Sequence, residues 1–257
     1  MRFLSYNIYK GGVNRLGRIA QVVRDCSPDI VGFCEANGWH DDNYQVLRYM
    51  QAATGLHNSF FCQANTAYHL VFLSLFSLFN TRCERVGLWH GSAVARYYSP
   101  DIGEVTIVLV HLDPRSEDER FKEVRLILSH FGLEKNLIMM GDFNSLSPAD
   151  CYTQDIFLSL QRKSIRKFGD AALRYDVINS ILDAGLHDVF DIKGRYPVSS
   201  VPTSLREDPT HIVPLRLDYI FVSPGLASYI KEVFFYTAGE SLEASDHFPL
   251  VVDFAFS

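Results

Sequence analysis

The chain contains several short apolar runs, and three of them are typical of strands covered on both faces. These runs are DIVGFC (29–34), VTIVLV (105–110) and NLIMM (136–140). None shows the apolar–polar alternation of a strand with one solvated face. Further strands are expected from other apolar segments, at residues 1–8, 92–99, 216–223, 231–238 and 247–256.

Helical spacing of apolar residues marks a second set of segments. The clearest is residues 116–132, where Ser116 and Glu119 have capping-box spacing and Gly132 closes the helix. Further helices are predicted at residues 15–26, 44–55 and 174–185.

Strands outnumber helices and many links have hairpin length, which favours two packed sheets with helices outside them.

The run LVFLSLFSLF (70–79) is too short to cross a membrane and is interpreted as a core strand. Residues 199–216 contain prolines and are expected to form an ordered surface loop. We find no internal repeat or low-complexity tract and therefore predict a single domain over residues 1–257.

Polar side chains follow or precede the predicted strands at several places. They are Asn7, Glu35, His111, Asp113, Asp142, Asn144, Asp218, Asp246 and His247. Active sites are commonly built this way, from polar groups that strand ends and loops deliver to one rim of a rigid sheet. The residues GDFN (141–144), directly after a buried strand, are the clearest example.

These residue types fit phosphoester chemistry supported by a divalent cation. Glu35 and Asp246 offer hard oxygen ligands that suit Mg²⁺ or Mn²⁺, and Asn7 is a further candidate ligand. A cation at this place would neutralise a phosphate oxygen and stabilise the charge of the transition state. Asn7 and Asn144 could also orient water or phosphate without adding negative charge.

Proton transfer needs further groups. Asp142 could align and deprotonate the attacking water, and His111 could protonate the leaving group. His247 beside an acid such as Asp218 would be favoured as an imidazolium that holds the phosphate. Arg216, two residues before Asp218, is a candidate phosphate ligand.

Each of these residues also has a plain structural interpretation. Glu35 could be a solvated strand end, and Asp218 could cap a strand. Arg206 and His211 fit a solvated loop slightly better than a binding site. Gly11 and Gly12 after the first strand are only a weak signal for a phosphate. The order of all the pieces along the chain is therefore what carries the functional interpretation.

Composition limits the partners and suggests a compartment. The net charge is −6, so the chain lacks the positive charge for indiscriminate nucleic-acid binding. The five cysteines are scattered without a CxxC pair, which favours reduced thiols in the cytoplasm. The N-terminus lacks the features of a signal peptide, and neither a transmembrane segment nor a protein partner is indicated.

With these residues in hand, the chain resembles the endonuclease/exonuclease/phosphatase superfamily, which has the deoxyribonuclease I-like fold. The matching blocks are SYNI with Asn7, VGFCE with Glu35, VLVHLDP with His111, MMGDFNS with Asp142 and Asn144, RLDYIFVS with Asp218, and SDHFPLVVDF with Asp246 and His247. The resemblance implies an α/β (α+β) four-layer sandwich, with two mixed sheets flanked by helices. It also implies Mg²⁺-dependent phosphoester cleavage, in which Glu35 and Asp246 contribute to metal binding and Asp142 handles the attacking water. His247 would contact the phosphate, with Asp218 next to it on the side away from the phosphate.

Departures from the family pattern bear on the substrate. Cys34 and His111 stand where the abasic-site repair branch tends to carry Gln and Tyr, which argues against close kinship with that branch. Leu75 replaces an Arg found in many relatives. We expect a nucleic acid or nucleotide ester as substrate, with a phospholipid or inositol-phosphate headgroup as the alternative. A catalytically silent binding module ranks low because the catalytic positions are intact.

Overall fold

Twelve strands form two mixed sheets of six strands each in the computed structural model, which describes residues 1–193, 196 and 198–256. The first sheet has the order β11-β12-β1-β2-β4-β3 and consists of β1 (Arg2–Asn7), β2 (Ile30–Cys34), β3 (Asn58–Cys62), β4 (Leu70–Ser74), β11 (Ile230–Phe235) and β12 (Leu250–Phe254). The second has the order β5-β6-β7-β8-β10-β9 and consists of β5 (Phe79–Glu84), β6 (Gly91–Ser99), β7 (Gly103–His111), β8 (Leu137–Asp142), β9 (His187–Asp188) and β10 (Asp218–Val222).

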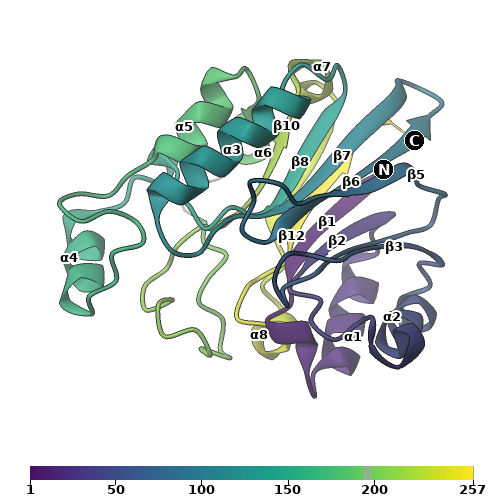
Figure 1. Ribbon diagram of the computed structural model, residues 1–257, viewed down its shortest axis with the longest axis horizontal. Helices are drawn as coiled ribbons and strands as arrows, with labels where there is room; N and C mark the ends of the chain where they lie inside the picture. The colour runs from purple at the N-terminus through teal and green to yellow at the C-terminus, as the bar shows by residue number, and fades with distance from the viewer. Residues whose placement is uncertain (194–195, 197, 257) are drawn as a thin grey trace.

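Helices cover the outer face of each sheet (Figure 1). On the first sheet lie α1 (Leu16–Cys26), α2 (Asp41–Thr54) and the short α8 (Ser241–Ala244). On the second lie α3 (Glu117–Phe131) and α5 (Asp176–Asp183). The remaining helices are α4 (Gln154–Arg162), α6 (Val189–Lys193) and α7 (Pro224–Ala227), with 3₁₀ turns at Lys10–Gly12 and Pro148–Asp150. The predicted α/β four-layer sandwich is confirmed.

Three apolar layers hold the sheets and the helices that cover them together, and a fourth apolar cluster packs α4 against the segment before β10. One lies between the sheets and includes Phe3, Leu109 and Met140. The second packs β1, β2 and β4 against α1 and α2, and the third packs the other sheet against α3 and α5. Strands buried on both faces need unbroken apolar sequence, which explains the runs in β2, β7 and β8.

Two local predictions need correction. The apolar run 70–79 is not one core strand: β4 ends at Ser74, and Leu75 and Phe76 are exposed in the turn to β5. The helix α4 was missed by the sequence pattern. In contrast, α3 begins as predicted, with the Ser116 hydroxyl accepting a hydrogen bond from the Glu119 N–H.

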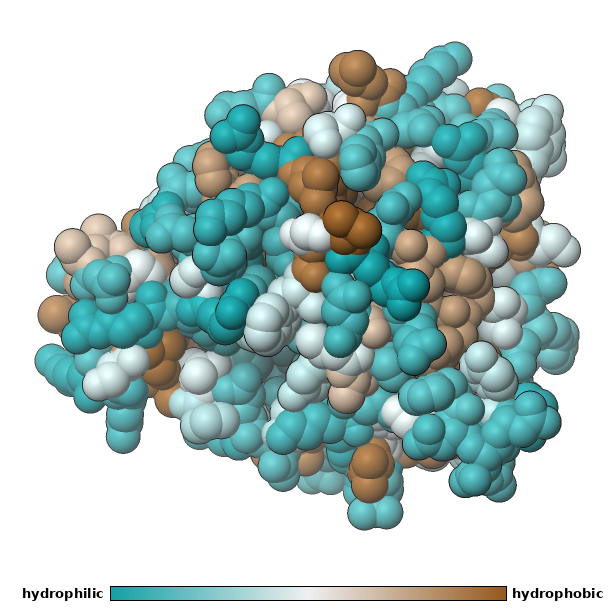
Figure 2. Space-filling view, in the orientation of Figure 1, coloured by the Kyte–Doolittle hydropathy of each residue, from teal (hydrophilic) through white to brown (hydrophobic). Residues whose placement is uncertain are grey.

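The surface is mostly polar on the face seen in Figure 2, with hydrophobic residues in small groups. Among the described residues no helix combines the length and apolar character needed to cross a membrane.

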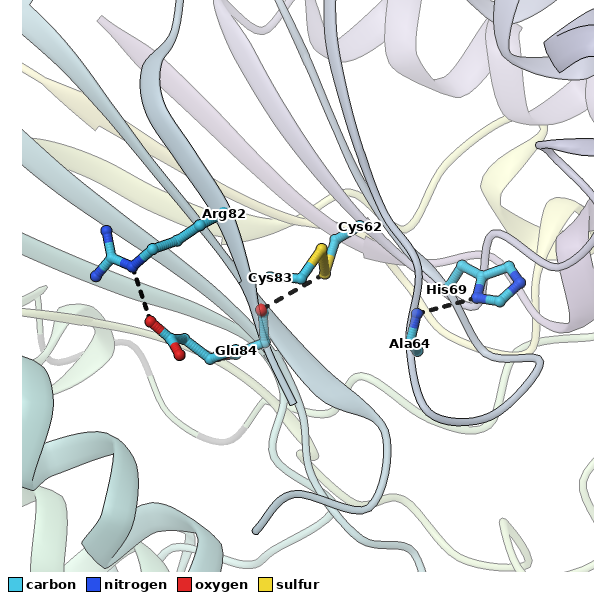
Figure 3. The surroundings of a disulfide bond; sticks show 7 residues. Cys62, Ala64, His69, Arg82, Cys83 and Glu84 are labelled. Carbon is cyan, nitrogen blue, oxygen red and sulfur yellow. Dashed lines mark hydrogen bonds and ion pairs between the residues drawn. A yellow bond between two sulfur atoms is a disulfide. The ribbon is translucent and has the colours of Figure 1, made fainter. Parts of the chain in front are cut away.

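Two of the five cysteines form a disulfide, which contradicts the prediction of reduced thiols throughout. Cys62 of β3 and Cys83 of β5 are joined with their Cα atoms 5.4 Å apart (Figure 3). The bond links the edge strands of the two sheets. Cys26, Cys34 and Cys151 are free. Because disulfides persist mainly in oxidising compartments, the cytoplasmic location loses the support that the cysteines lent it.

Reducing this disulfide, or replacing Cys62 and Cys83 with Ala, is expected to lower the free energy of unfolding by about 3 kcal/mol. The bond closes a loop with a sequence separation of 21, and opening it frees the unfolded chain. Denaturant unfolding with and without reductant measures the change. Cys151→Ala, at an exposed free thiol, is the control and should leave stability within about 0.5 kcal/mol. An unchanged midpoint under reductant would show that the two thiols are not joined in solution.

Candidate active site

Strand register brings the polar residues of the second sheet together. His111 is paired with Asp142 across the parallel strands β7 and β8, and Asp142 is paired with Asp218 across β8 and β10. In the first sheet, the parallel strands β1 and β2 pair Asn7 with Cys34, and Glu35 follows at once. Residues from both sheets line one cavity of about 250 Å³, among them Glu35, His111, Asp142, Asn144, Asp246 and His247.

Gly141 permits the close strand pairing that places Asp142. Its φ is +137°, and a Cβ at this position would lie 1.9 Å from the Val110 carbonyl oxygen. Only glycine combines this backbone conformation with so close a neighbour. The glycine before Asp142 therefore has a structural reason within the β7–β8 pair.

Gly141→Ala is expected to cost at least about 2 kcal/mol of unfolding free energy, because strain at φ and the clash with Val110 add. Gly103→Ala is the matched control. Gly103 also has a positive φ (+83°), but no atom lies within 4 Å of the place that a Cβ would take, so backbone strain alone should cost about 1 kcal/mol. Denaturant unfolding of both variants tests this, and equal losses would refute the steric argument.

The Asp142 carboxylate lies at the centre of the polar residues that line the cavity. Its Oδ2 accepts a hydrogen bond from Asn7 Nδ2 at 2.9 Å and lies 3.6 Å from His111 Nε2 and 3.9 Å from His247 Nε2. Its Oδ1 accepts the Asn144 N–H at 2.8 Å. Burial raises the pKa of Asp142, but the charges of His247 and His111 and these hydrogen bonds outweigh it, so the net shift is downward. The carboxylate is thus kept ionised.

Asn144 and Asn7 are both fixed in place. Asn144 has a positive φ of 51°, and its Nδ2 donates to the Leu112 carbonyl oxygen at 3.1 Å. Asn7 Nδ2 also donates to Glu35 Oε1 at 3.2 Å. Asn7 therefore bridges the acid of the first sheet and the acid of the second.

His247 and Asp218 form a buried pair. His247 Nδ1 lies 2.7 Å from Asp218 Oδ2, which fixes the imidazole ring. Burial lowers the pKa of His247, whereas the charges of Asp218 and Asp246 raise it, and the net result is a pKa of about 10. Burial raises the pKa of Asp218 despite the opposing charge of His247.

Glu35 and Asp246 supply the oxygen donors at the same cavity. Glu35 Oε2 accepts the Lys10 N–H at 2.8 Å, which the turn after β1 presents. Burial raises the pKa of Asp246 to about 6; the charge of His247 opposes this shift, and Glu35 adds to it. Two neighbouring acids, one of them buried, fit a divalent cation, because a cation would offset the charge that burial penalises.

Several residues that sequence reasoning missed or set aside also line this cavity, among them His90, Lys167 and His211. The His90 ring stacks on His111 with centroids 4.3 Å apart, and its Nδ1 lies 2.6 Å from the Thr66 hydroxyl.

His211 is buried, so its interpretation as part of a solvated loop was wrong. Burial, with the charges of His247 and Lys167, lowers the pKa of His211 to about 3. No local pattern marks these residues, since each comes from a loop or turn.

Arg216 is not brought to the cavity. Its side chain is fully buried, with Nε 2.9 Å from Asp150 Oδ1 and Nη1 2.6 Å from Asp188 Oδ2. The guanidinium also lies 4.3 Å from the centre of the Tyr219 ring. This position is incompatible with the predicted contact with phosphate. The two ion pairs instead join the segment before β10 to Asp150 and Asp188. Arg206 is exposed and does not line the cavity.

A two-sheet sandwich with acids, amides and histidines gathered at one rim defines the class of deoxyribonuclease I-like phosphoesterases. The chain belongs to the endonuclease/exonuclease/phosphatase family, whose model matches residues 4–247. Members of this family hydrolyse phosphoester bonds, typically with a divalent metal. No curated protein sequence matches the chain.

Solved structures with the same fold come from proteins of different activity. A 3′ phosphatase from Neisseria, bound to a product DNA hairpin, is 20% identical with a TM-score of 0.72, and 99% of each chain is covered. An AP endonuclease from Archaeoglobus fulgidus is 16% identical with a TM-score of 0.75 and the same coverage. A mannosyl-6-phosphatase from Bacteroides thetaiotaomicron is 20% identical with a TM-score of 0.67, and 98% of each chain is covered. At these identities the likeness supports the fold alone.

Proposed function

We propose that this protein is a divalent-metal-dependent hydrolase that cleaves a phosphoester by attack of water. The observation that carries the proposal is the position of Asp142. Its ionised carboxylate lies between Asn7 and two histidines, in a cavity that Glu35 and Asp246 also line. An ionised carboxylate at the wall of a cavity can orient a water molecule and accept its proton.

In this proposal Asp142 orients the attacking water and takes its proton, while Asn7 and Asn144 keep the carboxylate in place. His247, held by Asp218 and favoured as an imidazolium, donates a hydrogen bond to a phosphoryl oxygen. His111 faces Asp142 through Nε2 and is the candidate to protonate the leaving group.

Glu35 and Asp246 would hold the cation, with Asn7 as a further candidate ligand. When bound, Mg²⁺ or Mn²⁺ would neutralise charge on the phosphoryl oxygens during attack. Asn7 also contacts Glu35 directly, so it would keep that acid oriented whether or not it binds the cation itself.

The surroundings of the cavity favour a compact phosphoester, and we propose a nucleotide ester or the phosphorylated end of a nucleic acid. The described lining includes two lysines, Lys10 and Lys167, and no arginine. Long duplex binding relies on many such cations, and the net charge of −6 does not supply them. The relatives of known activity include a 3′ phosphatase bound to DNA and a sugar phosphatase. An inositol-phosphate or phospholipid headgroup is the alternative, because the same lysines would serve either.

Hydrolysis of a substrate panel with Mg²⁺, Mn²⁺ or EDTA tests the proposal. The panel holds 3′- and 5′-phosphorylated oligonucleotides, supercoiled and single-stranded DNA, RNA, sugar phosphates, inositol phosphates and sphingomyelin. We expect turnover of a nucleotide ester or nucleic-acid end that EDTA abolishes and added metal restores. Turnover unaffected by EDTA would contradict the metal role. Binding without turnover of any panel member would favour a silent binding module instead.

A further inference from the structure

We propose that His211 is a nitrogen ligand of the catalytic cation, which makes the metal site a mixed oxygen and nitrogen site selective for Mn²⁺ over Mg²⁺. The inference rests on the proposed function, since it concerns the cation held by Glu35 and Asp246. The residue lies in the loop between α6 and β10, and its side chain is 3% exposed.

One nitrogen of the His211 ring faces Asp246, one of the two acids proposed to hold the cation. Nδ1 lies 3.6 Å from Asp246 Oδ2 and makes no hydrogen bond within the described part of the chain. Ligand atoms of His211, Asp246 and His247 all lie within 4.8 Å of one another. Two donor atoms that share one cation lie roughly 3 to 3.5 Å apart, so the observed separation is close to that of paired ligands.

The other ring nitrogen faces a second carboxylate. His211 Nε2 lies 3.7 Å from Asp208 Oδ2, and Asp208 is itself held by the N–H and hydroxyl of Thr210, both at 2.7 Å. Metal-binding histidines commonly direct one ring N–H to a carboxylate, which orients the ring and leaves the other nitrogen free for the cation. In His211 the two ring nitrogens face different carboxylates in the same way, although Nε2 at 3.7 Å from Asp208 is too far for a direct hydrogen bond.

His247 is less suited to be the nitrogen ligand, although it belongs to the same group. Its Nδ1 is committed to Asp218 at 2.7 Å, and its Nε2 faces Asp142 at 3.9 Å. His211 Nδ1, in contrast, is a buried nitrogen without a hydrogen-bond partner in the described chain, and an orphaned polar atom of this kind calls for an explanation.

A nitrogen donor changes which cation the site prefers. Mg²⁺ is bound almost entirely through oxygen, whereas imidazole favours transition metals. We therefore expect tighter binding of Mn²⁺ than of Mg²⁺. His211→Gln should weaken Mn²⁺ binding about tenfold or more and Mg²⁺ binding by less than about threefold.

Electron spin-echo envelope modulation of bound Mn²⁺ tests the ligand directly, because it detects nitrogen-14 coordinated to the ion. Calorimetric titration with Mn²⁺ and Mg²⁺ accompanies it. The first variant is His211→Gln, whose side-chain amide keeps a polar group near Asp208 but places no metal-binding nitrogen at the position of Nδ1. The second is His90→Gln, which removes another histidine of the same cavity. Circular dichroism checks that both variants are folded.

The expected result is nitrogen modulation in the wild type and in His90→Gln, and its loss in His211→Gln. Wild-type protein that binds Mn²⁺ without nitrogen modulation would overturn the inference and leave the proposed function standing. Modulation that persists in folded His211→Gln would overturn it as well. If that variant does not fold, His211→Asn takes its place and is read in the same way. Wild-type protein that binds neither cation would overturn the proposed function together with the inference.

Discussion

Asp142→Asn is expected to lower kcat for the best substrate of the panel by about 10³-fold, because an amide cannot accept the proton of the attacking water. The substitution preserves the size of the side chain and can still accept the N–H of Asn144. The effect should fall on kcat, since the residues that hold the cation, Glu35 and Asp246, are unchanged. Steady-state kinetics at saturating metal measure it.

The control for this variant is Asp113→Asn. Asp113 also follows β7 and is buried, but its carboxylate binds Arg115 and does not line the cavity. We expect Asp113→Asn to retain kcat within about threefold. Equal losses in both variants would mean that a general structural disturbance, and not a missing base, explains the loss in Asp142→Asn. An Asp142→Asn variant with near wild-type kcat would refute the role of Asp142.

Arg216→Met is expected to lower the free energy of unfolding by about 3 to 5 kcal/mol, because it leaves Asp150 and Asp188 buried without their cation. Methionine fills similar space, so the loss reports mainly the unpaired charges. Denaturant unfolding measures it. Because Arg216 does not line the cavity, KM measured on the folded variant should change little.

Arg18→Met is the matched control for that experiment. Arg18 also pairs with two acids, Glu240 at 2.7 Å and Glu243 at 2.9 Å, but its side chain is 47% exposed. Exposed pairs contribute little, so the loss should stay within about 1 kcal/mol. A large rise in KM with unchanged stability in Arg216→Met would show that Arg216 contacts the phosphate, as predicted from the sequence.

Much of the fold was predictable because local patterns and tertiary burial agree. The unbroken apolar runs of β2, β7 and β8 exist because helices and the opposite sheet cover both faces of these strands. The predicted start of α3 was also correct, since a cap is a local interaction. The run 70–79 was misread because hydrophobicity alone cannot distinguish a buried strand from the exposed turn that follows it.

The candidate site was predictable where its residues stand at strand ends. Asp142, His111 and Asp218 meet because β7 and β8 end, and the antiparallel β10 begins, at the same edge of the sheet. Arg216 was misplaced by the same reasoning. Its closeness to Asp218 in sequence says nothing of Asp150 and Asp188, which draw its side chain to a different part of the fold.

The sequence by itself determined the two packed sheets, the family and the residues offered at the strand ends, because these follow from periodicity and from short motifs. Only the tertiary structure decided which loop residues join them. His90, Lys167 and His211 reach the cavity, and Cys62 meets Cys83, through the packing of segments distant in sequence. Such contacts depend on the path of loops and on which sheet edges meet, and neither is encoded in the spacing of residues along the chain.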